Sequence, residues 1–357
     1  DLARQSNGLS VDTGWVQDAN VADFNGDGTP DVLFGDHGVE QHAGQVNPGA
    51  TNKLFLGDPA GLVAGPSSEG INSDVSFWHS TRAADLDADG DVDVVAVNTQ
   101  VDATTYPEGE GRGLQVFEND GSGGFTRRMA WVPEDADATV DGARVVTVVA
   151  LAELTGDAYP ELIAGFAQDF GDSGQRFDTR IYEGSASGFA DTPLRSIPRP
   201  PESALGHPPE DYFTDKIHTG DLNGDGRTDI VVYYADFADH GHNLVQLLYQ
   251  QEDGSFADRT PAALGGYELE SPRPAEMPKG GPSVEIVDVN SDGLMDLHWT
   301  FDLVQVPENW EPTVFLNEGD GTFARLSERA PGTLADTVVP RGSLNWARFL
   351  DADGDGR

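Results

Sequence analysis

The stretch that decides the fold lies at residues 221–232 and reads DLNGDGRTDIVV. Close copies of it begin at five other positions, which are Asp23, Asp85, Glu153, Asp288 and Asp351. Successive copies start 62, 68, 68, 67 and 63 residues apart. This spacing indicates an internal repeat whose unit is about 66 residues long.

Each of the first five copies is followed by a second pattern, in which an apolar strand leads into a Gly-rich turn and an aromatic or apolar residue. The copy at residues 314–323 reads VFLNEGDGTF, which is typical of a β-hairpin. β-Branched and aromatic residues also flank the acidic stretch, as in IVVYY at 230–234. Each unit is therefore predicted to contain four antiparallel strands, which is the number in a β-propeller blade. A β-sandwich array or a calcium-dependent β-helix would repeat at other periods.

The acidic stretch has the pattern D-x-[DN]-x-D-G-x-x-D, which concentrates oxygen atoms in a tight turn. Ca²⁺ takes six to eight oxygen ligands at about 2.3–2.6 Å, and side chains at positions 1, 3, 5 and 9 supply them. Glycine at position 6 permits the left-handed backbone that wraps the chain round an ion. The sequence therefore predicts about five or six Ca²⁺ sites.

The predicted metal ligands are the side chains at those four positions of each copy. They are Asp23, Asn25, Asp27 and Asp31; Asp85, Asp87, Asp89 and Asp93; Glu153, Thr155, Asp157 and Glu161; Asp221, Asn223, Asp225 and Asp229; Asp288, Asn290, Asp292 and Asp296; and Asp351, Asp353 and Asp355. The third copy has Ala158 where the others have glycine, so we expect weaker or absent metal binding there.

Two other kinds of structure contain acidic, Gly-rich stretches. An EF-hand requires a glutamate at position 12, but the five complete copies carry Phe34, Ala96, Ala164, Val232 and Trp299 there, so an EF-hand is excluded. A single Asp-Gly stretch can be an ordinary β-turn. Six copies in phase with the strands favour metal binding, and we expect the ions to stabilise the fold rather than to act in catalysis.

Composition limits the classes of partner. The 357 residues carry 62 acidic against 21 basic side chains, a formal net charge of −41. Such a surface repels phosphate and anionic lipid, so we expect no nucleic-acid binding and no direct membrane insertion. There is no cysteine, hence no disulfide or thiolate metal site. The 17 Phe, 8 Tyr and 6 Trp are too many for a disordered acidic segment.

The segments DFNGDGTPDVLFG at 23–35, DLNGDGRTDIVV at 221–232 and VFLNEGDGTF at 314–323 resemble the FG-GAP/VCBS-type repeats of calcium-binding, integrin α-like propellers. The resemblance implies an all-β, seven-bladed β-propeller with calcium loops between strands 1 and 2 of each blade. It also implies an extracellular protein, secreted or at the cell surface.

We expect residues 1–357 to form one β-propeller that is incomplete at its C-terminus, because the sixth acidic copy meets the end of the sequence. The expected blades are 12–70, 71–139, 140–206, 207–273 and 274–338, followed by a partial blade at 339–357.

Two groups of side chains are candidates for ligand binding. Basic residues at or near equivalent positions of the first strands would line the propeller axis and bind an acidic group such as a uronic acid: Arg82, Lys216, His218 and Arg348. Alternatively, they pair with Asp18 and Glu285 and neutralise the channel. Loop histidines form the second group, as a transition-metal site or as solvated side chains: His37, His240 and His242.

The leading hypothesis is a calcium-binding adhesion module that binds a protein or polysaccharide ligand. A polysaccharide lyase or sugar dehydratase with its site on the axis is the alternative from another class, and a structural propeller in a larger assembly is a third. The sequence contains no Ser-His-Asp order, P-loop or dinucleotide motif, so it identifies no catalytic residue.

Overall fold

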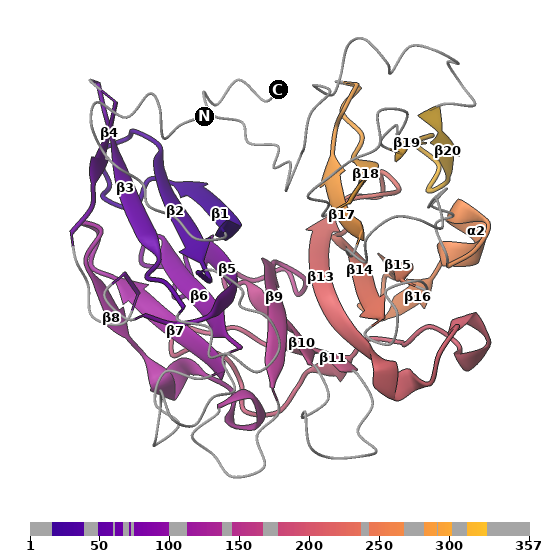
Figure 1. Cartoon of the computed structure of the whole chain (residues 1–357), viewed down its shortest axis with the longest axis horizontal. Helices are drawn as coiled ribbons and strands as arrows, with labels where there is room; N and C mark the ends of the chain where they lie inside the picture. Colours follow the sequence, from indigo (N-terminus) through magenta and orange to yellow (C-terminus); the bar gives the residue numbers. More distant parts are fainter. Residues whose placement is uncertain are drawn as a thin grey trace. The chain divides into compact units, whose positions relative to one another are not determined.

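A computed structural model of the chain describes most of the predicted units. The described residues are 16–38, 49–59, 61–66, 71–72, 75–99, 113–137, 145–166, 178–236, 243–267, 282–290, 292–301 and 313–326. They form antiparallel sheets whose strands follow chain order (Figure 1).

The described residues contain five four-stranded sheets. Sheet 1 holds β1 (Val16–Ala22), β2 (Asp31–Asp36), β3 (Lys53–Asp58) and β4 (Gly61–Ala64). Sheet 2 holds β5 (Trp78–Ala84), β6 (Asp93–Asn98), β7 (Gly113–Asn119) and β8 (Phe125–Arg127). Sheet 3 holds β9 (Val146–Ala152), β10 (Glu161–Phe166), β11 (Asp178–Tyr182) and β12 (Arg195–Ser196). Sheet 4 holds β13 (Tyr212–Gly220), β14 (Asp229–Asp236), β15 (Leu244–Gln250) and β16 (Phe256–Asp258). Sheet 5 holds β17 (Pro282–Val287), β18 (Asp296–Phe301), β19 (Thr313–Asn317) and β20 (Phe323–Arg325).

Each sheet is a blade of the β-propeller type, and its acidic stretch connects the first strand to the second, as predicted. We call these connections acidic loops 1 to 5, with nine positions each: 23–31, 85–93, 153–161, 221–229 and 288–296. Helices are few in the described part: α2 (Thr260–Leu264) and 3₁₀ turns at Met129–Trp131, Glu134–Ala136, Glu202–Ala204 and Pro209–Asp211.

The prediction of seven blades was wrong, because the described residues form five. Seven came from the resemblance to other repeat proteins and not from this sequence. At the repeat spacing of 62 to 68 residues, a chain of 357 residues holds five complete units.

The core lies between successive sheets. Trp78, Val94 and Phe117 of sheet 2 form one buried cluster with Leu33 and Leu54 of sheet 1. Further clusters join sheets 2 and 3, and sheets 4 and 5. Because a middle strand meets apolar neighbours on both faces, its sequence is an apolar run rather than an alternation: every residue of β6 and β14 is buried.

A β-bulge interrupts the first strand of four blades. The bulged residues are Gln17, His79, Thr147 and Asp215. Each lies six residues before its acidic loop, so bulge and loop repeat with one spacing. A bulge increases local twist and changes the direction of the neighbouring side chains. The Nδ1 atom of His79, the bulged residue of β5, lies 2.9 Å from the Thr147 carbonyl oxygen.

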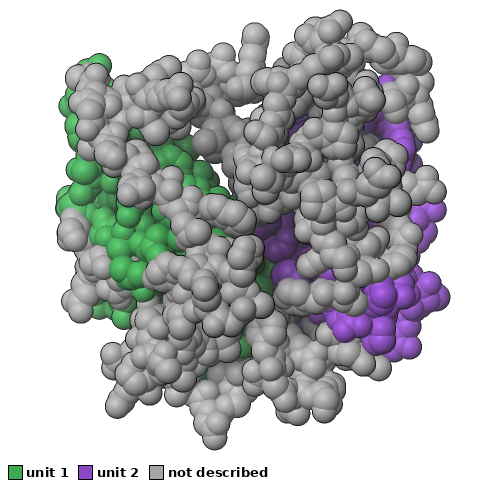
Figure 2. Space-filling view, viewed as in Figure 1, with its two compact units in different colours: residues 1–172, 179–196 green, residues 173–178, 197–357 purple. Residues whose placement is uncertain are grey.

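Two compact units divide the blades. Unit 1 comprises residues 1–172 and 179–196, and unit 2 comprises residues 173–178 and 197–357 (Figure 2). Apart from Asp178 at the start of β11, sheets 1 to 3 therefore belong to unit 1, and sheets 4 and 5 belong to unit 2. Among the described residues, none of the helices has the length and apolar character needed to cross a membrane.

Candidate metal-binding loops

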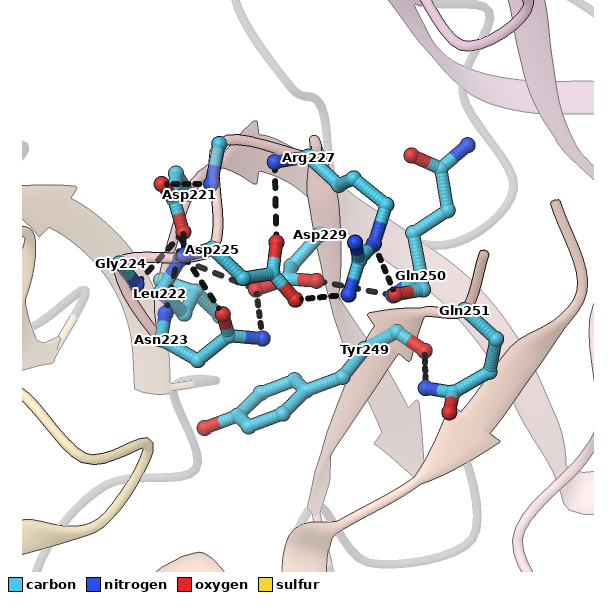
Figure 3. Close-up of polar contacts among 11 residues, drawn as sticks. Asp221, Leu222, Asn223, Gly224, Asp225, Arg227, Asp229, Tyr249, Gln250 and Gln251 are labelled. Atoms are coloured by element: carbon cyan, nitrogen blue, oxygen red, sulfur yellow. Dashed lines mark hydrogen bonds and ion pairs between the residues drawn. The ribbon is translucent and has the colours of Figure 1, made fainter. Parts of the chain in front are cut away.

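Position 1 of each acidic loop binds the backbone of its own turn. In loop 4 the Gly226 amide donates to Asp221 Oδ2 at 2.8 Å, and the Gly224 amide donates to Asp221 Oδ1 at 2.7 Å (Figure 3). Gly226 has a φ angle of +79°, a conformation that side chains disfavour. The same bond from position 6 to position 1 recurs in loops 1, 2 and 5 at 2.7, 3.0 and 2.8 Å.

Positions 3 and 5 tighten the loop by side-chain to backbone bonds two residues ahead. Asn223 Oδ1 accepts from the Asp225 amide, and Asp225 Oδ1 accepts from the Arg227 amide, both at 2.9 Å. Equivalent pairs occur in loops 1, 2 and 5. Such bonds favour turns. As a result, oxygen atoms from positions 1, 3 and 5 gather in one short segment.

The acid at position 9 is buried and ties the loop to the sheet. Asp93 Oδ2 accepts from the Leu86 amide at 3.0 Å, and its Oδ1 accepts from the Asn119 amide of β7 at 2.8 Å. Asp31, Asp229 and Asp296 make the same two kinds of bond. Burial outweighs these bonds and raises the pKa of Asp93 to about 7 and that of Asp229 to about 6. Desolvation therefore disfavours the ionised form of both carboxyl groups.

Loop 3 departs from this geometry where its sequence departs. Ala158 replaces glycine at position 6 and does not adopt a positive φ angle. Glu153 Oε1 instead accepts from the Gly156 amide at 2.5 Å and the Thr155 amide at 2.9 Å. The longer Glu153 side chain still lies near Asp157 and Glu161, with one oxygen from each within 4.8 Å of the others.

The carboxylate oxygens of loop 2 lie close enough together to share one divalent cation. One carboxylate oxygen from each of Asp85, Asp87 and Asp89 lies within 4.8 Å of the other two. Asp85 Oδ1 is shielded from solvent and has no hydrogen-bond partner in the described structure. A shielded anionic oxygen is costly unless a cation compensates it. All-oxygen ligands are those that Ca²⁺ prefers.

The predicted axial cation Arg82 forms an ion pair. Its Nη1 lies 2.8 Å from Asp18 Oδ2, which also accepts from the Thr81 amide at 3.0 Å. This is one of the pairings that the alternative interpretation predicted, and it joins β1 to β5. The loop histidine His37 is buried, stacks on Phe77 with centroids 4.3 Å apart, and has Nδ1 2.9 Å from the Gly38 oxygen.

Lys216 and His218 lie on β13 of sheet 4. Lys216 is almost wholly buried, with Nζ 4.0 Å from Asp215 Oδ1. His218 is partly exposed and pairs in register with Val231. Six other predicted site residues lie outside the described residues: His240, His242, Arg348, Asp351, Asp353 and Asp355.

Sequence reasoning missed two asparagines at the ends of third strands. Asn119 Nδ2 donates to the Phe24 oxygen in loop 1 at 2.8 Å, and Asn317 Nδ2 donates to the Leu222 oxygen in loop 4 at 2.9 Å. Each bond spans 95 residues and fastens an acidic loop to the following blade. The signal in the sequence was the shared asparagine before the hairpin turn, in NDG at 119–121 and NEG at 317–319.

Comparison with known repeats identifies the family. The model of the FG-GAP-like repeat matches residues 23–96, 221–299 and 288–357, more than half of the chain. The chain belongs to the FG-GAP-like repeat family. The expected resemblance is thereby confirmed. Residues 97–220, which include the divergent loop 3 of this FG-GAP-like repeat protein, lie outside the matched segments.

Solved structures with a similar fold are only distantly related in sequence. An α-L-arabinofuranosidase from Clostridium thermocellum is 13% identical, with a TM-score of 0.46 and coverage of 86% of this chain and 92% of that one. A rhamnogalacturonan lyase from Bacillus licheniformis is 15% identical, with a TM-score of 0.41. That comparison covers 86% of the FG-GAP-like repeat protein and half of the lyase. No curated protein matches the sequence.

Proposed function

We propose that this protein is an extracellular calcium-binding repeat module that binds a protein or polysaccharide ligand. The observation that carries the calcium proposal is the arrangement in loop 2. There, three carboxylates lie together, and the shielded Asp85 Oδ1 has no hydrogen-bond partner in the described structure. Loops 1, 4 and 5 repeat its turn and its buried ninth acid.

In this proposal, the side chains at positions 1, 3, 5 and 9 hold the ion in each acidic loop. Bound Ca²⁺ supplies positive charge to a group of acids that otherwise repel one another. Since the loop joins two strands of one blade, the binding free energy adds to the stability of that blade. The role of the ion is therefore to stabilise the fold.

The test is calcium titration by calorimetry, combined with thermal unfolding in calcium and in excess chelator. We expect chelation to lower the melting temperature. Asp85→Asn should weaken one class of sites by roughly tenfold or more, because it removes one ligand charge. Asp191→Asn, at an exposed position outside the acidic loops, is the matched control and should bind like the wild type. A chelated protein that melts at the unchanged temperature would refute the proposal.

The proposed extracellular setting agrees with the type of site. Calcium modules outside the cell bind with dissociation constants of about 10⁻⁴ to 10⁻³ M, which surface loops of this kind can provide. Secretion is testable by expressing the full-length gene product in its native host and assaying the culture medium and cell surface. Recovery only inside cells would contradict it.

The ligand proposal rests on Arg82 of β5, which is partly exposed and forms an ion pair with Asp18 of β1. Binding of homogalacturonan, an acidic polysaccharide, should weaken in Arg82→Ala and stay unchanged in Arg195→Ala. New ultraviolet absorbance from an unsaturated product would instead favour the polysaccharide lyase. No binding to homogalacturonan and no such product would overturn both proposals for this acidic polysaccharide and favour a protein ligand.

A further inference from the structure

Loop 4 contains a basic side chain, Arg227, that forms an ion pair with one of its acids. The Arg227 Nη2 atom forms an ion pair with Asp225 Oδ2, and Arg227 Nε donates to the Gln250 oxygen at 3.0 Å (Figure 3). Gln250 is itself held, because its amide donates to Asp229 Oδ1 at 2.8 Å. The end of β15 therefore fixes the guanidinium against the carboxylate at position 5.

Loops 1 and 5 show the arrangement without this arginine. There the asparagine at position 3 donates to the aspartate at position 5, from Asn25 to Asp27 at 3.1 Å and from Asn290 to Asp292 at 2.9 Å. In loop 4 the guanidinium takes that place on Asp225 Oδ2.

The side-chain amide at position 3 of loop 4 has a different partner from those of loops 1 and 5. Asn223 Nδ2 donates to Asp229 Oδ2 at 3.3 Å. Position 7 carries threonine in loop 1 and leucine in loop 5. Loops 1 and 4 otherwise share the sequence D-x-NGDG, so they form a natural matched pair.

We propose that Arg227 lowers the calcium affinity of loop 4, so that this site fills after loop 1. The proposal rests on the proposed calcium function. A guanidinium on a ligand oxygen repels an incoming Ca²⁺ and must leave that oxygen, while calcium affinity follows the net negative charge of the ligands. Arg227 thus sets the calcium concentration at which loop 4 is occupied.

Solvent screening limits the size of the effect. The side chains of Arg227 and Asp225 are 35% and 27% exposed. An ion pair at such a site contributes less than a buried one. We therefore expect removal of the guanidinium to tighten calcium binding in loop 4 by roughly tenfold.

Tyr249 provides a readout specific to loop 4. Its hydroxyl donates to the Gly321 oxygen at 2.7 Å. A Cβ atom placed on Gly321 would lie 2.8 Å from Tyr249 Cε2 and 3.3 Å from Asn223 Cβ, so the ring lies beside the loop. Tb³⁺ in loop 4 should therefore luminesce when Tyr249 is excited. The part of the Tb³⁺ luminescence that is lost in Tyr249→Phe reports on loop 4. Added Ca²⁺ should displace this Tb³⁺ and reduce that part of the signal.

Arg227→Thr gives loop 4 the position 7 residue of loop 1. The Ca²⁺ dissociation constant of loop 4, obtained from displacement of the Tyr249-sensitised Tb³⁺ signal, should fall by roughly tenfold in this variant. Because Tb³⁺ also binds more tightly there, its own affinity is measured first and the Ca²⁺ constant corrected for it. Arg195→Thr removes the same charge from β12 and should change nothing. The reciprocal Thr29→Arg should weaken one site in calcium calorimetry. Arg227→Gln serves as a second variant if Arg227→Thr does not fold.

The outcomes separate this inference from the proposed function. Absence of calcium heat in the wild-type protein would overturn both. Calcium binding by the wild type, with the same loop 4 affinity in Arg227→Thr and Arg227→Gln, would overturn the inference alone. Equal tightening in Arg195→Thr would also overturn it, because the effect would then come from overall charge.

Discussion

The acid at position 9 performs a different task from the other acids of its loop. Asp93 is buried and receives two backbone amides, whereas Asp85, Asp87 and Asp89 lie nearer to solvent. The sequence pattern predicted all four as equivalent ligands. Their difference depends on burial by the neighbouring strands, which a nine-residue pattern does not contain.

Burial of this acid predicts an unusual pH dependence. The folded-state pKa values of Asp93 and Asp229, about 7 and 6, lie above the value of 3.8 for an exposed aspartate. The folded state therefore binds these protons more tightly than the unfolded state does, and its stability increases as the pH falls through 7 and 6. In chelator, the melting temperature should rise as the pH is lowered from 8 to roughly 5.

Thermal unfolding across this pH range checks the prediction. Asp93→Asn cannot titrate and should show a shallower slope than the wild type. With saturating calcium the slope should reverse, because protons compete with the ion for the carboxylates. A melting temperature that falls on acidification in chelator would contradict the assignment.

At the scale of the element, the acidic loops and hairpins could be predicted from sequence because both are local. Their turns depend on glycine and on side-chain oxygens within a few residues. The contacts of Asn119 and Asn317 could not be predicted, since each partner lies 95 residues away. The ion pair of Arg227 with Asp225 is local in sequence, but Gln250, from the third strand, holds the guanidinium in place.

These asparagines should be important for stability. Asn119 Nδ2 donates to the Phe24 oxygen at a buried site and to the Val92 oxygen at a partly buried one, and Asn119→Ala leaves both carbonyls without that donor. We expect a loss of about 1–3 kcal/mol in the free energy of unfolding, measured by urea denaturation. The matched control is Asn72→Ala, whose amide donates to the Pro66 oxygen at an exposed site. A similar loss in both variants would contradict the role of Asn119.

At the scale of the whole molecule, the sequence predicted an all-β repeat protein correctly but predicted the wrong number of blades. Strand order follows from the four apolar segments of each repeat, because segments that are consecutive in sequence pair as neighbours. Blade number is not encoded in any one repeat. Each acidic loop favours a turn within its own repeat, but no residue of a repeat specifies how many blades the protein forms.

The net charge of −41 predicts a dependence on salt. Repulsion among the acids destabilises the folded state, and monovalent ions screen it. In chelator, the melting temperature should increase as sodium chloride rises from about 0.05 to 0.5 M. With calcium bound the increase should be smaller, because each ion neutralises two charges. A melting temperature independent of salt in chelator would show that repulsion has little influence.

The hydrogen bond from Asn119 to the Phe24 oxygen also has a consequence for the order of events during synthesis. Residue 24 leaves the ribosome long before residue 119 is made, so the first blade cannot complete its hydrogen bonds when its own strands have emerged. The same delay separates Leu222 from Asn317. Loop 1 is therefore completed only when the second blade has been made, and loop 4 only when the fifth blade has been made.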